Sequence, residues 1–150
     1  MNLEHIPFKE RYRNELLQVW EASVRATHKF LEPDEVGFYK GLVEKIEFGA
    51  LNTHVVFNEE GTMVGFWGTE GVNLVMLFLH PEYIGKGIGK AVFRHIEGVH
   101  NITKLEVNEQ NPLAVAFYQK MGFEITARKP VDDLGKPHPI LIMQKQKREI

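Results

Sequence analysis

Cysteine is absent from the 150-residue sequence. Its absence excludes disulfides, thiolate metal sites and cysteine nucleophiles. Long hydrophobic runs are absent as well, since none approaches the ~20 residues that a membrane-spanning helix needs. The N-terminal stretch MNLEHIPFKERYRNELL mixes acidic and basic side chains and has no apolar core of the kind that a signal peptide contains. We therefore expect a cytoplasmic protein that does not contact a membrane.

An excess of charge of one sign is also lacking. The chain has 18 Lys and Arg against 20 Asp and Glu, which gives a formal net charge of -2. A broad basic surface is therefore not expected, and we predict no nucleic-acid partner. The seven histidines include no His-Glu-x-x-His pair or other ligand spacing, so no metal site is predicted.

The pattern that is present is that of a mixed α/β domain. No repeat, low-complexity tract or linker divides the chain, so residues 1–150 are expected to form a single domain. Apolar residues recur at helical spacing in some segments and alternate or run together in others. Their order, β-α-α-β-β-β-α-β-α-β-β, predicts a mixed sheet with helices on its faces. The predicted strands are 3–6, 54–57, 63–68, 72–79, 104–107, 123–128 and 140–145, and the predicted helices are 9–27, 33–48, 87–98 and 112–121.

Two of these helices carry an apolar stripe along one face. The stripe of the third helix consists of Ile88, Val92, Ile96 and Val99. The stripe of the fourth consists of Leu113, Phe117 and Met121. Of the two, the stripe of the fourth helix is expected to be buried.

Three alternate glycines, Gly85, Gly87 and Gly89, lie where the strand 72–79 leads into the next helix. A helix N-terminus offers unpaired N–H groups and a partial positive charge, and glycines allow the backbone to close around a phosphate. The spacing differs from the dinucleotide fingerprint G-x-G-x-x-G. It also differs from the nucleoside-triphosphate loop, because Ala91 stands where a hydroxyl would be needed. A tight turn without a ligand is the alternative.

The loop Ile84 to Gly89, which follows a strand and His80-Pro81, resembles the pyrophosphate loop Arg/Gln-x-x-Gly-x-Gly/Ala of the GCN5-related N-acetyltransferase (GNAT) family. The stretch VNEQNPLAVAFYQKMGF (107–123) resembles the family's Asn-containing loop and cofactor-side helix. A closer likeness is to the YjaB-type bacterial acetyltransferases, which share segments like ATHKFL, VNEQN and VDDLGKPHP. The resemblance implies a GNAT fold with a mostly antiparallel sheet of about seven strands. Ile84 departs from the family pattern and lacks the polar side chain found there.

The resemblance implies acetyl-CoA as co-substrate, without a metal. It also implies direct transfer of acetyl to a primary amine on a small molecule, a peptide N-terminus or a protein lysine. The pantetheine arm would lie along residues 77–79, where the N–H of Leu79 could stabilise the carbonyl oxygen as negative charge develops. The expected cofactor-binding residues are Leu77, Leu79, Ile84, Gly85, Lys86, Gly87, Ile88, Gly89, Lys90 and Asn111.

Tyr118 matches the tyrosine that family members direct toward the thiolate leaving group. Because its pKa of ~10 exceeds the ~8.5 of a thiol, we expect mainly a hydrogen bond to sulfur; the alternative is a buried partner of Phe117. The amine must lose a proton, and Glu106 is the first candidate base, with Glu70, His28 or a water chain as alternatives. Asn111 could equally cap the following helix.

The acceptor pocket is expected between the first two helices, around Trp20, Ser23, His28, Phe30 and Leu31. An aromatic stripe of this kind also fits a plain hydrophobic core. Two further functions stay open. One is a non-catalytic acyl-CoA-binding module, and the other is a transferase acting on aminoacyl-tRNA, which the lack of a basic surface disfavours. The sequence leaves the oligomeric state open, although many family members form homodimers through their late strands.

Overall fold

The structure, a computed structural model, describes residues 2–146. Along this part of the chain the elements follow the predicted order, and every strand boundary lies within two residues of the predicted one. The strands are β1 (Glu4–Pro7), β2 (Asn52–Phe57), β3 (Met63–Glu70), β4 (Asn73–Leu79), β5 (Lys104–Asn108), β6 (Phe123–Lys129) and β7 (Ile140–Lys145). The helices are α1 (Arg13–Thr27), α2 (Pro33–Val43), α3 (Ile88–His100) and α4 (Pro112–Lys120), and short 3₁₀ turns precede α1 and α3.

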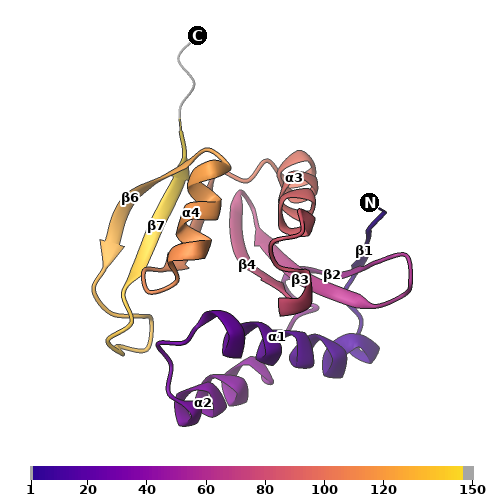
Figure 1. Cartoon of the computed structure of the whole chain (residues 1–150), viewed down its shortest axis with the longest axis horizontal. Coiled ribbons are helices and arrows are strands. Elements are labelled where there is room, and N and C mark those ends of the chain that lie inside the picture. Colours follow the sequence, from indigo (N-terminus) through magenta and orange to yellow (C-terminus); the bar gives the residue numbers. More distant parts are fainter. Residues whose placement is uncertain (1, 147–150) are drawn as a thin grey trace.

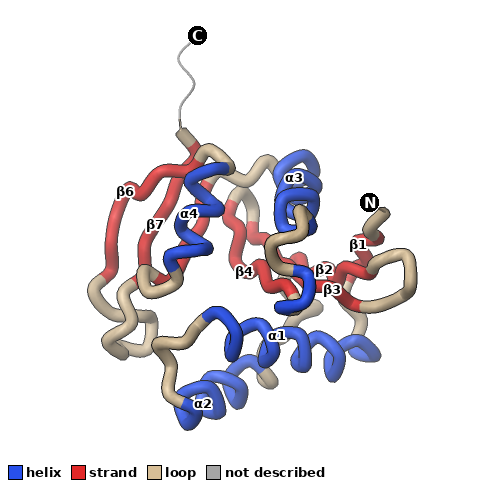
Figure 2. Tube along the Cα trace, in the orientation of Figure 1, coloured by secondary structure: helices blue, strands red, loops and turns tan. Residues whose placement is uncertain are grey.

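The strands form one seven-stranded sheet in the order β1-β2-β3-β4-β5-β7-β6. Every neighbouring pair is antiparallel except β4 and β5, which run parallel. Helices α1 and α2 cover one face of this sheet, and α3 and α4 cover the other (Figures 1 and 2). The predicted class, a mixed and mostly antiparallel sheet with four flanking helices, is confirmed.

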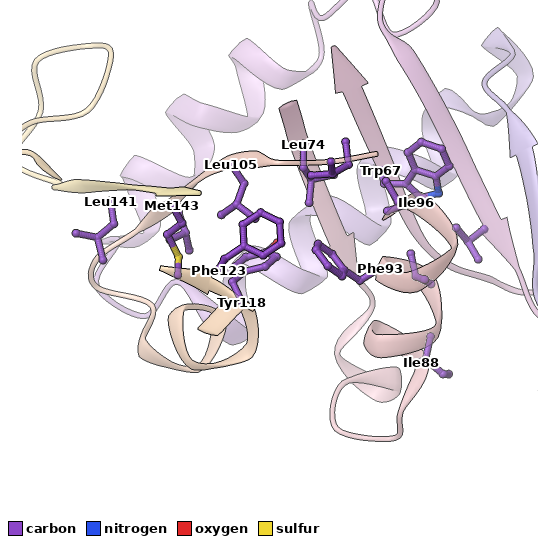
Figure 3. Packing of buried hydrophobic residues seen from close by; sticks show 14 of the residues in the cluster. Trp67, Leu74, Ile88, Phe93, Ile96, Leu105, Tyr118, Phe123, Leu141 and Met143 are labelled. Carbon is purple, nitrogen blue, oxygen red and sulfur yellow. The ribbon is translucent and has the colours of Figure 1, made fainter. Parts of the chain in front are cut away.

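Buried apolar side chains form a cluster under each pair of helices. On the α3 and α4 side, the ring of Phe93 meets Phe117, Tyr118 and Phe123 edge-on, with centroids 5.7 to 6.0 Å apart. Figure 3 shows Phe93, Tyr118 and Phe123 converging between the helices and the sheet. Edge-to-face aromatic pairs restrict ring orientation as well as burying apolar area. This cluster therefore fixes where α4 presents Tyr118.

The second helix is shorter than predicted, because α2 ends at Val43 rather than near Phe48. The Arg13 guanidinium donates from Nη1 to the carbonyls of Glu44 and Ile46, both at 3.1 Å. It also lies 5.2 Å from the centroid of the Phe48 ring, which is fully buried. Because Arg13 satisfies carbonyls beyond the helix end, the chain can turn inward and bury Phe48.

The stripe predicted for α4 is wrong at Leu113, whose side chain is 76% exposed. The buried residue of this helix is Tyr118, while Phe117 and Met121 are half-buried. Helical spacing identifies an apolar face but cannot show whether that face meets the sheet or lines a cleft. Here the face with Leu113, Phe117 and Met121 lines a cleft.

In the stripe on α3, Ile88, Val92 and Ile96 are buried, whereas Val99 is 60% exposed. His100 continues the four-residue spacing in its place, with its ring centroid 5.6 Å from that of Trp67. Within residues 2–146, no helix combines the length and apolar character needed to cross a bilayer.

Replacing Phe93 by Ala should lower the free energy of unfolding by about 3–5 kcal/mol, because the change leaves a cavity among three aromatic rings. Urea unfolding followed by circular dichroism measures this loss. Val99→Ala on the same helix is the matched control and should change stability by less than about 0.5 kcal/mol. Equal losses in the two variants would contradict the burial assigned to this helix.

Candidate active site

The sheet opens in its middle, where β4 and β5 separate. The two strands pair only at Asn73 with Lys104 and at Leu74 with Leu105. On the other side of β4, the register with β3 shifts after these residues, so that Val75 is an extra residue in the strand. A bulge bends a strand and increases its local twist. The rest of β4 therefore stays paired with β3 but has no partner on the side of β5.

The gap exposes backbone groups of Leu77 and Leu79. His80 donates its N–H to the carbonyl of Val64 at 2.9 Å, so residues 78 and 76 are the next ones to bond with β3. Alternation along an antiparallel ladder then directs the N–H and C=O groups of Leu77 and Leu79 toward the gap. The side chains of both leucines pack toward α3 and α4. The N–H of Leu79 thus has the orientation that an oxyanion donor would need.

The glycine loop connects β4 to α3. Gly85 and Gly87 adopt left-handed backbone conformations, with φ of 80° and 82°. The first helical hydrogen bond runs from the N–H of Ala91 to the carbonyl of Gly87, which leaves the N–H groups of residues 88–90 without a helical partner. A Cβ on Gly89 would lie 3.3 Å from Cδ1 of Leu79, the end of a side chain that would have to shift by a few tenths of an ångström. The loop therefore presents free amides, and it packs closely against the Leu79 side chain.

Two cavities meet at the gap between β4 and β5. The first, of about 550 Å³, borders the glycine loop and α4. The second, of about 790 Å³, borders α1, α2, β5 and the loop between β6 and β7. Six residues line both: His28, Leu77, Phe78, Asn111, Ala114 and Tyr118. The cleft therefore reaches both faces of the sheet. We call the first part the loop-side cavity and the second part the helix-side cavity.

Most residues predicted to bind a cofactor line the loop-side cavity. These are Leu77, Leu79, Ile84, Gly85, Gly87, Gly89, Lys90 and Asn111. Lys86 does not line it, and Ile88 is buried in the core, so Ile88 can offer only its backbone N–H there. Asn111 lies at the cleft and also accepts a bond from the N–H of Ala114 at 3.4 Å, so it caps α4 as well.

The residues predicted for the acceptor divide between the cavities. Trp20 and Phe30 line the helix-side cavity, Ser23 lines the loop-side cavity, and His28 lines both. Ser23 is buried and its carbonyl accepts a bond from the Thr27 hydroxyl at 2.7 Å. Leu31, Glu70 and Glu106 also line the helix-side cavity. The structure therefore brings these predicted residues to one cleft, although not all to the same part of it.

Sequence reasoning missed cationic residues of the loop-side cavity, Arg94 and Lys120. Arg94 could have been found, because it lies one helical turn beyond Lys90 on the same face. It also missed Tyr39, Asp132 and His138 of the helix-side cavity. These come from segments far apart in the sequence, and no local pattern brings them together.

Tyr118 is 8% exposed and lies at the junction of the two cavities. Burial raises the pKa of its hydroxyl above the ordinary value of 10. The group therefore stays protonated at neutral pH, and it can donate a hydrogen bond into the cleft.

In its neutral form, the His28 ring carries its hydrogen on Nδ1. The Thr27 hydroxyl donates to the Ser23 carbonyl, so its oxygen accepts from Nδ1 of His28, 2.8 Å away. Nε2 is then left with a lone pair. Burial lowers the pKa of His28 from 6.5 to about 4. Taking a proton from an ammonium of pKa ~10.4 would cost this ring about 9 kcal/mol, so His28 is suited to accept a hydrogen bond rather than to act as the base.

Glu106 lies in the wall of the helix-side cavity, with its side chain on the face of β5 opposite Leu105 and Val107. Its carboxylate forms an ion pair with Lys129 at 2.5 Å. Any role as a base would therefore compete with this pair. Within the described residues, no three His, Asp or Glu side chains gather in a set that could hold a metal ion.

The free amides of the glycine loop, the cations of the loop-side cavity and the open edge of β4 are together suited to a phosphate-bearing cofactor with an extended amide arm. The arm could pair with the backbone of Leu77 and Leu79, as an added strand would. The helix-side cavity reaches the same junction from the opposite face. A second substrate could therefore meet the end of that arm beside Tyr118.

Comparison with known proteins agrees with this geometry. The family model for the acetyltransferase (GNAT) domain matches residues 50–125. The peptidyl-lysine N-acetyltransferase YjaB of Salmonella typhimurium is 39% identical over 129 residues, which cover 84% of this chain and 86% of the relative. The solution structure of apo YjaB from Escherichia coli superposes with a TM-score of 0.89 at 34% identity and covers 99% of this chain and 100% of that one.

A more distant structure, the PaiA N-acetyltransferase of Thermoplasma acidophilum in complex with coenzyme A, has a TM-score of 0.76 at 21% identity. It covers 98% of this chain and 100% of its own, and the likeness shows a shared fold. The family match and the 39% identity to YjaB go further. The chain belongs to the GNAT acetyltransferase family and is an N-acetyltransferase.

Proposed function

We propose that this N-acetyltransferase transfers acetyl from acetyl-CoA directly to the side-chain amine of a protein lysine, within a single domain. The observation that carries the proposal is the cleft that crosses the sheet at the gap between β4 and β5. One end offers amides and cations to a cofactor, and the other end is open to a second substrate. The YjaB relative is a peptidyl-lysine N-acetyltransferase, which favours lysine over a small amine or a peptide N-terminus.

Acetyl-CoA, when bound, would supply the thioester. The amides of residues 88–90 and the side chains of Lys90, Arg94 and Lys120 would hold its phosphates. The N–H of Leu79 would donate to the thioester carbonyl oxygen as that oxygen gains negative charge. Ile84 removes one polar side chain from this set, so binding would depend more on the backbone amides and on the cationic side chains that remain.

Tyr118 would donate a hydrogen bond from its hydroxyl to sulfur as the carbon–sulfur bond breaks. Because burial raises its pKa, complete proton transfer to a thiolate is unfavourable, and a hydrogen bond is the role that its chemistry supports. Nε2 of His28 would accept a hydrogen bond from an N–H of the attacking amine and so orient the lone pair of the amine nitrogen. The amine must first lose a proton, at a cost of roughly 4.6 kcal/mol at pH 7. Glu106 or a water chain through the helix-side cavity would receive it, and the second proton, which the nitrogen loses as the amide forms, would pass to the departing thiolate.

A non-catalytic binding module is the predicted alternative. The relatives named as N-acetyltransferases support catalysis over this alternative. The cytoplasmic location and the homodimer stay predictions. Fractionation of cells and sedimentation of the purified protein would test them.

Replacing Gly87 by Glu should raise the Kd for acetyl-CoA at least about a hundredfold. The residue has a φ of 82°, which side-chain-bearing residues adopt at a cost of roughly 1 kcal/mol or more, and a carboxylate there would repel phosphate. Calorimetric titration measures the Kd. Gly98→Glu is the matched control, because Gly98 lies in the same helix region with open space around it and no positive φ. An unchanged Kd for Gly87→Glu would exclude phosphate binding at this loop.

Replacing Tyr118 by Phe should reduce kcat about 10- to 100-fold while the Kd for acetyl-CoA changes little, since a hydrogen bond to a charged group is worth about 1.5–3 kcal/mol. Release of coenzyme A from acetyl-CoA with lysine peptides can be followed with a thiol reagent, because the protein itself has no cysteine. Tyr12→Phe, far from the cleft, should leave kcat unchanged. Equal rates of Tyr118→Phe and the native protein would remove the role given to this hydroxyl.

Stability should rise with pH between about 4 and 6.5 because of His28. Its folded pKa is about 4 against 6.5 unfolded, so in this window the unfolded chain binds the extra proton and folding is disfavoured. At pH 5 the penalty is about 2 kcal/mol, and it vanishes above pH 6.5. Urea unfolding at pH 5 and 7 should therefore show a smaller difference for His28→Gln than for the native protein. The same difference in both proteins would mean that His28 is not buried as a neutral ring.

A further inference from the structure

The loop between β6 and β7, residues 130–139, contacts α2 across a long distance in sequence. The Tyr39 hydroxyl donates to Oδ2 of Asp132 at 2.5 Å, although the two residues lie 93 positions apart. Figure 1 shows this loop beside the connection between α1 and α2. Tyr39 and Asp132 both line the helix-side cavity. The bond therefore closes one side of the cavity that we assign to the acceptor.

His138 makes a second connection from the same loop. It is 8% exposed, and its Nε2 lies 2.7 Å from Oε2 of Glu35 on α2. A carboxylate can only accept, so Nε2 carries a proton. Nδ1 lies 3.1 Å from Oε1 of Gln110, the residue before the N-cap of α4. His138 therefore joins α2, the β6–β7 loop and the start of the helix that carries Tyr118.

Phe30 completes the same surface. Its ring centroid lies 5.4 Å from that of His28 and 5.3 Å from that of His138. All three rings line the helix-side cavity. We use the name acceptor wall for Phe30, Tyr39, Asp132 and His138. Two of the segments singled out in the sequence, ATHKFL and VDDLGKPHP, thus meet in one surface.

The β6–β7 loop has hydrogen bonds of its own in addition to those with α2. Oδ1 of Asp132 accepts from the N–H groups of Leu134 and Lys136, both at 2.9 Å, and Gly135 provides a left-handed turn. Asp132 thus shapes the loop with one carboxylate oxygen and contacts Tyr39 with the other. The bonds to α2 link this loop to the helix on the other side of the cavity, while the N–H of Glu109 donates to the carbonyl of Pro139 at the end of the loop.

We propose that Tyr39, Glu35, Asp132 and His138 are positioning residues. The hydrogen bonds from Tyr39 to Asp132 and from His138 to Glu35 would hold the acceptor wall in place for a lysine carried on a peptide. The inference rests on the proposed function. A lysine side chain entering the helix-side cavity leaves its peptide backbone at the cavity mouth, against the wall. A small alkyl amine has no such backbone, so its reaction should not depend on where the wall lies. The wall would therefore select peptide-borne lysine over small amines.

The test compares Tyr39→Phe, Glu35→Ala and Glu35→Gln with the native protein. Tyr39→Phe removes one hydroxyl, and Glu35→Ala removes the partner of His138. Glu35→Gln is the conservative control, because its one amide oxygen can still accept from His138 in place of Oε2. Its NH2 group then replaces the oxygen that accepts from the N–H of Glu32, so the capping bond is lost in Glu35→Gln as in Glu35→Ala, and only the bond to His138 distinguishes the two variants. Each protein is assayed with a lysine-containing octapeptide and with butylamine, and the Kd for acetyl-CoA is measured by calorimetry.

Tyr39→Phe and Glu35→Ala should raise the KM for the octapeptide about three- to tenfold, the effect of losing one hydrogen bond. The KM for butylamine and the Kd for acetyl-CoA should change less than twofold, and Glu35→Gln should recover most of the octapeptide KM. Equal changes with both acceptors, or no change with either, would overturn the proposal, because the bonds would then only support the fold or do nothing. A native protein that acetylates butylamine but no peptide would instead refute the lysine acceptor, and the inference with it.

Discussion

The separation of β4 from β5 is the feature on which the rest of the site depends. In a sheet that is otherwise antiparallel, these two parallel strands pair at only two positions and then part. A buried strand edge without a partner leaves backbone donors and acceptors that must be satisfied by something else. Here the unsatisfied edge faces a cleft. The sheet therefore supplies a binding surface made of backbone, and a ligand with amide groups of its own can complete it.

The bulge at Val75 makes this gap compatible with two intact cores. Leu74 lies on the side of α3 and α4, and the extra residue re-phases the strand so that Leu77 and Leu79 return to that side. Met76 and Phe78 pack toward α1 and α2. A strand that simply diverged without the bulge would keep its alternation but change which side chains meet each cluster. One inserted residue, Val75, therefore both bends the strand and keeps apolar side chains of β4 in each of the two clusters.

Much of the fold could be predicted from the sequence because its signals are local. The alternating strands, the Pro33 helix start and the glycine-rich junction each act within a few residues, and their positions were correct. The errors arose where tertiary contacts decide. Arg13 ends α2 early by bonding carbonyls of the following turn, and the aromatic cluster around Phe93 selects Tyr118 rather than Leu113 as the buried residue of α4.

The site shows the same division. Most loop-side residues lie in two segments, 77–94 and 111–121, and the glycine pattern and the family resemblance pointed to both segments. The helix-side cavity is assembled from α1, α2, β5 and the β6–β7 loop, and bonds such as that from Tyr39 to Asp132 span 93 residues. The spacing of apolar residues along the sequence cannot predict a contact between residues so far apart. The pKa of His28 could not be predicted from the sequence either, since its low value follows from burial that only the fold reveals.

This arrangement separates what the backbone does from what side chains do. The phosphate and amide binding that we propose for the loop side would use backbone N–H groups, which every residue except proline has, so Ile84 in place of a polar residue would leave these donors in place. The helix-side cavity, which we propose for the acceptor, is lined by side chains from segments far apart in the sequence, each of which can change independently. Tyr118 lies between these parts, fixed by the aromatic core rather than by either substrate. The chemistry can therefore stay constant in such a fold while the acceptor surface varies around it.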